Sequence, residues 1–152
     1  MLYLLAILIG IVAGFRAMIA PAAIAWAARL GMLDLHGSYL AFLGNAWVPW
    51  LLTLAAVAEL LNDKRASTPS RKVPPQFAVR VLSGALCGAA IGIPAGWWAI
   101  GLVLGAVGAV IGTLGGAAVR GVMASTFGKD LPAALVEDIV AVLFAAFIVH
   151  SL

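Results

Sequence analysis

Five long hydrophobic segments make up most of this 152-residue chain, and they constrain its fold more than any motif does. A helix that crosses a bilayer needs about 20 apolar residues, whereas a soluble domain carries about 25% charged residues. Here 64% of the residues are hydrophobic and only 10% are charged. The sequence therefore predicts an all-α membrane protein, a single transmembrane domain over residues 1–152 folded as a compact bundle of about five helices. The predicted spans are residues 2–30, 39–61, 76–93, 97–123 and 131–152.

Two prolines lie within these segments and mark places where a span is expected to break or to re-enter. Proline removes a helical hydrogen bond and clashes with the preceding turn. Pro21 is the expected break in the first segment, which is longer than the membrane is thick. Pro49, in the stretch NAWVPW, predicts a kink or an interfacial anchor, so that the second span begins late.

The loop of residues 62–75 is the polar connection of the chain, and its lysines and arginines predict its side of the membrane. Loops rich in Lys and Arg face the cytoplasm. Five spans then place the N-terminus in the cytoplasm and the C-terminus in the periplasm. The net charge of +3 is explained by this orienting role, so we expect no binding to nucleic acid. The basic residues of the loop are Lys64, Arg65, Arg71 and Lys72.

Glycine recurs at spacings of three and four residues in the third and fourth predicted spans. This spacing puts the glycines on one helix face and lets two helix backbones approach closely. A packing seam within one chain is the favoured interpretation, and an interface between identical copies or a pore lining is the alternative. The residues predicted to pack helices are Gly84, Gly88, Gly92, Gly101, Gly105, Gly108 and Gly112, and Gly115 continues the series.

A weak internal repeat relates residues 1–61 to residues 92–152. In this alignment Gly10 matches Gly101, and Gly14 matches Gly105. The repeat predicts two inverted halves on either side of the third span, an arrangement that is common in transporters.

Arg16 lies in the middle of the first hydrophobic segment, where a charge costs about 2.5 to 3.5 kcal/mol. It lies roughly 20 Å along the helix, too deep to reach the inner surface by extending its side chain. We therefore expect a buried polar site in which Arg16 meets a carboxylate from another helix. Glu59, Glu137 and Asp138 are the candidates, and because adjacent helical residues point about 100° apart, only one of the last two is expected to face Arg16. An ion pair that merely fixes helix register is the alternative.

The basic loop offers a second candidate site, for an anion or a lipid headgroup. Hydroxyl and basic side chains beside a membrane attract phosphate, although a solvated connection that only orients the chain is the alternative. The candidates are Lys64, Ser70, Arg71, Lys72 and Arg80.

No catalytic residue, cofactor or metal is expected from the remaining polar residues. His36 lies two residues from Asp34, but no further ligand follows at the spacing of a metal site. Cys87 is the one cysteine, so it cannot form an intrachain disulfide and is read as a small packing residue.

Several stretches together resemble the bacterial membrane family catalogued as domain of unknown function 4126. They are AGFRA (13–17), ELLNDK (59–64), TPSRKVPPQFAVRVLSGALCGAAIG (68–92), GAVIGTLGGAAVRG (108–121) and FGKDLPAALVEDIVA (127–141). The resemblance covers nearly the whole chain and implies a small multi-span protein of unassigned activity in a bacterial inner membrane. It points to the polar positions Arg16, Glu59, Asp63, Lys64, Arg71, Arg80, Glu137 and Asp138.

The leading functional hypothesis is a transporter or channel-like protein for a small solute or ion, working as a homo-oligomer through its glycine-rich helix faces. It rests on the inverted halves, the glycine-lined helices and the buried Arg–carboxylate set. One alternative is an enzyme or binding protein for a phospholipid or polyprenyl phosphate at the cytoplasmic face. Enzymatic activity is less expected than its absence. The other is a structural subunit of a membrane complex. Membrane lipid is the partner common to all three.

Overall fold

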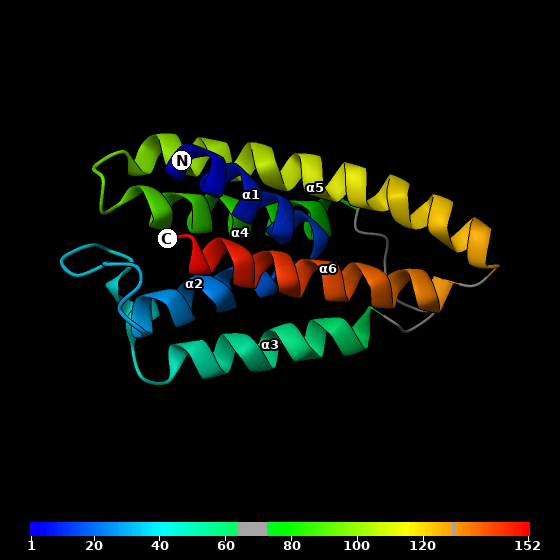
Figure 1. Ribbon diagram of the computed structural model, residues 1–152, viewed down its shortest axis with the longest axis horizontal. Coiled ribbons are helices and arrows are strands. Elements are labelled where there is room, and N and C mark those ends of the chain that lie inside the picture. The colour runs from blue at the N-terminus through cyan, green and yellow to red at the C-terminus, as the bar shows by residue number, and fades with distance from the viewer. Residues whose placement is uncertain (64–72, 129) are drawn as a thin grey trace.

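Helices form all the regular structure in the described part of the chain, residues 1–63, 73–128 and 130–152 of a computed structural model. The prediction of an all-α fold is confirmed for these residues. The helices run side by side along the long axis of the molecule (Figure 1). In chain order they are α1 (Leu2–Phe15), α2 (Ile19–Arg29), the 3-10 helix η1 (Ala41–Gly44), α3 (Val48–Asn62), α4 (Pro74–Gly92), α5 (Trp98–Phe127) and α6 (Asp130–His150).

Two of the described helices are long and apolar enough to cross a membrane, over residues Trp98–Thr126 of α5 and Leu131–His150 of α6. The helices α1 and α3 are apolar but hold 14 and 15 residues, which is about 21 and 22 Å of helix against a hydrocarbon core about 30 Å thick. The expectation of five spans is therefore not confirmed. The last three predicted segments agree with α4, α5 and α6 to within a few residues.

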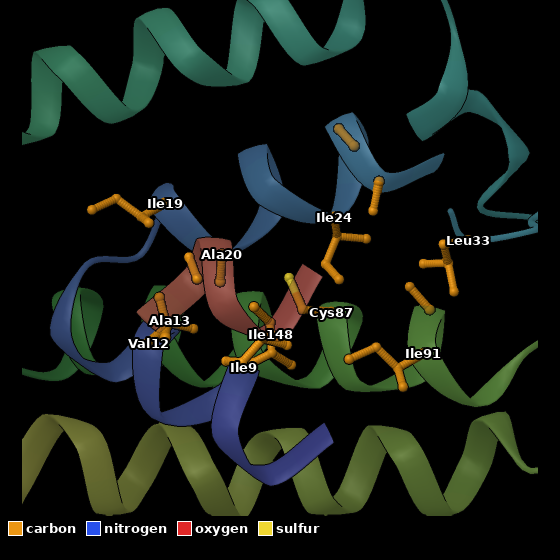
Figure 2. Close-up of a cluster of buried hydrophobic side chains, with 14 of the residues drawn as sticks. Ile9, Val12, Ala13, Ile19, Ala20, Ile24, Leu33, Cys87, Ile91 and Ile148 are labelled. Carbon is orange, nitrogen blue, oxygen red and sulfur yellow. The ribbon is translucent and has the colours of Figure 1, made fainter. Parts of the chain in front are cut away.

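The first hydrophobic segment reverses its direction instead of continuing as one helix. Near its start, Tyr3 packs against Trp97 just before α5, with ring centroids 4.4 Å apart, and at its end Phe15 reaches Arg80 in α4. The helix α2 then returns along α4, from Ser83 beside Ala17 toward the far end of α4, and Leu33 after α2 belongs to the same buried cluster as Ile91 (Figure 2). We call residues 2–29 the hairpin and residues 16–18, which join its two helices, the tip.

The tip precedes Pro21, so the expected break exists but its predicted position is wrong. Pro21 is the third residue of α2. The first turn of a helix leaves its N–H groups without helical partners, so a residue that lacks an N–H is tolerated there. Pro49 likewise lies in the first turn of α3, where it begins the helix rather than kinking it. As predicted, this second helix begins late in its segment, at Val48.

The reversal also changes the relation between the ends of the chain. The N- and C-termini lie at the same end of the bundle, opposite the end where α3 finishes and α4 begins (Figure 1). This arrangement does not support the expectation that the termini lie on opposite sides of a membrane. The described residues do not show the predicted inverted halves either, because α1 runs in the same direction as α5 (Figure 1), and α5 is one helix of 30 residues where the first half turns back.

Glycines allow α1, α4 and α5 to pack with their backbones nearly in contact. A Cβ atom at Gly84 or at Gly105 would overlap the backbone of the other residue, and one at Gly108 would overlap the backbone of Ile7 in α1. The glycine series of the sequence thus forms a seam within one chain, while an interface between copies stays a prediction. Further Cβ atoms that would overlap a neighbouring backbone are those of Gly10, Gly14, Gly88, Gly92, Gly101 and Gly112, whereas Gly115 has open space beside it.

The hydrophobic core fills the space between the hairpin, α4 and α6 (Figure 2). Ile9 and Ile24 project into it from the two arms of the hairpin, and Ile148 projects from α6. Cys87 is fully buried among them, in the packing role that its small size suggests. The core therefore fixes the hairpin against the two helices that bring charged side chains to its tip.

We predict that alanine lowers the stability of the fold at one glycine of α5 but not at another. Gly105→Ala puts a Cβ against the backbone of α4 and should lower the free energy of unfolding by about 1 to 3 kcal/mol, as overpacking does. Gly121→Ala meets no atom within 4 Å and should leave stability unchanged or raise it slightly, because alanine favours helix. Unfolding midpoints in one detergent measure both effects, and equal shifts would contradict the packing seam.

Candidate functional site

The amide groups at the tip of the hairpin are bound by a carboxylate from another helix. In an unbroken helix the N–H groups of Ala17 and Met18 would donate to carbonyls four residues earlier. Here both donate to Glu59 of α3, one to each carboxylate oxygen, at 2.8 Å each. Glu59 thereby caps the N-terminal end of α2, where the helix dipole favours a negative charge.

The carbonyl groups at the end of α1 are bound by a cation. Arg80 of α4 donates through Nη1 to the carbonyl oxygens of Gly14, at 3.0 Å, and Phe15, at 2.6 Å. The hydroxyl of Thr113 in α5 lies 3.4 Å from the Gly14 carbonyl oxygen, and its shorter hydrogen bond, at 2.8 Å, goes to Ala109 in its own helix. The guanidinium of Arg80 lies at the C-terminal end of α1, where the helix dipole favours a positive charge.

The carbonyl of Ala17 receives its hydrogen bond from Ser83 of α4. In an unbroken helix this carbonyl would face Pro21, which has no N–H to donate. The Ser83 hydroxyl supplies the donor instead, at 2.5 Å. Pro21 thus contributes to the site even though the chain does not break at its position.

Arg16 itself is fully buried, and carboxylates from two other parts of the chain surround its guanidinium. Its Nε donates to Oδ1 of Asp138 at 2.7 Å, and its Nη2 lies 2.6 Å from the same oxygen. Nη2 also lies 2.9 Å from Oδ2 of Asp63, at the end of α3, but 3.8 Å from Oε2 of Glu137. Of the two adjacent acids in α6, Asp138 is therefore the close partner.

Arg120 of α5 also contacts these carboxylates, a role that was not predicted from the sequence. Its Nη1 donates to Oδ2 of Asp63 at 2.5 Å and lies 3.6 Å from Oε2 of Glu137. Asp63 thus bridges Arg16 and Arg120. The family resemblance pointed to Asp63 as a polar position, whereas Arg120 was not named as a site residue from the sequence, although a charge that far along an apolar helix is itself a signal of a buried partner.

These side chains form two sets of ion pairs that meet at the tip, and we call them together the charge cluster. Oε1 of Glu59 lies 3.5 Å from Nη2 of Arg80. Arg80 and Arg16 both donate to the carbonyl oxygen of Phe15, at 2.6 and 3.4 Å, so this carbonyl joins the two sets. All its side chains are at most 19% exposed, so each charge depends on its neighbours instead of on water. The members are Arg16, Glu59, Asp63, Arg80, Arg120, Glu137 and Asp138.

The predicted headgroup site falls largely outside the described residues. Lys64, Ser70, Arg71 and Lys72 all lie there, so binding of an anion or headgroup by this loop stays a prediction. Arg80, the fifth candidate, is buried in the charge cluster and faces the hairpin.

The loop after α2 holds the other charged pair named from the sequence. Asp34 accepts hydrogen bonds through Oδ1 from the backbone N–H of His36, at 3.0 Å, and pairs with its ring at 2.8 Å. The backbone hydrogen bond, more than the ring, lowers the pKa of Asp34. Across the described residues, no group of three or more His, Cys, Asp or Glu side chains is arranged to hold a metal ion.

Comparison with known proteins identifies the family. The family model described as domain of unknown function (DUF4126) matches residues 3–151, so the chain belongs to this family, as the resemblance in its sequence implied. No curated protein and no solved structure matches the chain.

We predict that the two adjacent acids of α6 differ in their effect on stability. Asp138→Asn leaves Arg16 buried without its closest counter-charge, so it should lower the free energy of unfolding by on the order of 3 kcal/mol. Glu137→Gln is the matched control, and it should cost much less because Glu137 lies farther from Arg16. Unfolding titrations of the purified variants compare them, and an equal loss in both would contradict the pairing.

Proposed function

We propose that this chain is a multi-pass protein of a bacterial inner membrane that transports a small solute or ion, with the charge cluster as its binding site. The observation that carries the proposal is the tip of the hairpin, where two helices end inside the fold and charged side chains from other helices hold their ends. Transporters commonly bind substrates and coupling ions at such interrupted helices. The family match is compatible with this function but assigns none.

The surface of the protein supports a place in the membrane. Besides the two long apolar helices, α3 exposes a row of large apolar side chains at the edge of the bundle. Non-helical backbone at membrane depth is tolerated only where protein or a water-filled cavity surrounds it. The tip meets this condition, since Glu59, Arg80 and Ser83 bind its backbone.

The contacts at the tip suggest how an ion would bind. Glu59 occupies a position suited to an anion, at the start of α2, and Arg80 occupies one suited to a cation, at the end of α1. In the proposed mechanism these two side chains hold the site closed. A displacement of α3 would withdraw Glu59 and open the N-terminal end of α2 to a transported ion.

Transport would be tested with purified protein in liposomes on a solid-supported membrane. Concentration jumps of sodium, potassium, chloride, acetate and phosphate should give a transient current with at least one ion. Glu59→Gln should reduce that current at least tenfold, because the two N–H groups of the tip donate to different oxygens and the amide NH2 that replaces one of them cannot accept.

The matched control is Asp34→Asn, which also removes one carboxylate but lies in the exposed loop after α2 and should leave the current unchanged. Arg16→Leu should abolish the current while the protein still inserts, since leucine enters a membrane more easily than arginine. Absence of current with every ion, or full current in Glu59→Gln, would contradict the proposal.

A further inference from the structure

An apolar groove of about 300 Å³ lies between α1, α5 and α6, beside the charge cluster. Phe15 and Ile11 form its wall on α1, and Val136 and Val140 form its wall on α6. Arg120 and Glu137 are its charged lining residues. The apolar groove therefore reaches one side of the charge cluster.

The groove exists because α5 lacks two side chains along it. Gly115 and Gly116 both line it, and a Cβ at Gly115 would meet no atom within 4 Å. A Cβ at Gly116 would instead press on the ring of Phe15. Gly115 thus borders empty space, whereas the glycines of the packing seam contact another helix.

The surroundings of the groove favour a hydrocarbon occupant over water. Ile111 and Val119 on α5, and Val136 and Val140 on α6, are each between 41% and 59% exposed, so the groove opens on an apolar face. That face belongs to the two helices that are long and apolar enough to cross a membrane. Water is stable in a cavity only with two to four polar partners, which these walls do not provide.

We propose that this groove binds one acyl chain of an anionic membrane phospholipid. The acyl chain lies between α5 and α6 and fills the space beside Gly115. Without it, the residues that line the groove would lack dispersion contacts on that side. The groove reaches Arg120, which also binds Asp63, and guanidinium is the group that best matches a lipid phosphate. The groove shares Arg120 and Glu137 with the charge cluster, and its occupancy rests on the proposed place of the protein in a membrane but does not depend on transport.

The test uses full-length protein in liposomes of phosphatidylethanolamine and phosphatidylglycerol, with a trace of phosphatidylglycerol that carries a diazirine near the end of one acyl chain. After illumination, mass spectrometry of peptides locates the cross-links. The wild-type protein should be labelled mainly on groove residues of α5 and α6. Gly115→Leu places a side chain in the groove, at a position where a Cβ meets no atom within 4 Å, and should reduce this labelling at least fivefold.

Gly121→Leu is the matched control, because it makes the same change at another open glycine of α5 that does not line the groove, and labelling should persist. Val136→Trp should fill the groove from α6 and reduce labelling even if Gly115→Leu fails to fold. Equal labelling of the exposed face of α3, at Leu51 and Leu54, would reveal general lipid contact and overturn the proposal. Loss of the label on adding polyprenyl phosphate, but not unlabelled phosphatidylglycerol, would also overturn it.

Discussion

The rest of the structure depends on how the tip of the hairpin satisfies its charge and its bare backbone groups away from water. A buried guanidinium and unbonded N–H and C=O groups are each too costly to remain without partners. Glu59 binds the N–H groups, Arg80 and Ser83 bind the carbonyls, and Asp138 binds Arg16. Four side chains from three other helices thus make one reversal possible, and these helices must keep their positions relative to the tip.

The glycine seam provides those positions. Close contact of α1 with α4 and α5 brings Arg80 and Thr113 within reach of the end of α1. Larger side chains in place of these glycines would separate the helices by more than a hydrogen bond can span. The function of the glycines is therefore indirect, since they place polar side chains at the tip by bringing backbones together. At Gly115, beside the end of α1, the same residue type leaves a groove instead.

The sequence predicted the parts of this arrangement that a single residue or segment determines. A charge deep in an apolar segment required a carboxylate partner, and Arg16 has one. The reversal could not be predicted, because residues 2–30 form one hydrophobic segment in the sequence and the reversal depends on partners far along the chain, such as Glu59 and Ser83. The break was predicted at Pro21, but proline is tolerated in the first turn of a helix, and the chain breaks before that residue. The choice between Glu137 and Asp138 depended on the rotation of α6, which packing decides.

The reversal itself is tested most directly by a distance across the hairpin. Leu4 and Leu30 are both exposed, so each can be replaced by a spin-labelled cysteine in a Cys87→Ala background. Along one straight helix, 26 residues would separate the labels by about 39 Å. Pulsed electron paramagnetic resonance on protein in liposomes should give a markedly shorter distance, since α1 begins and α2 ends at the same end of the bundle (Figure 1). A distribution centred near about 39 Å would contradict the hairpin and the charge cluster built around its tip.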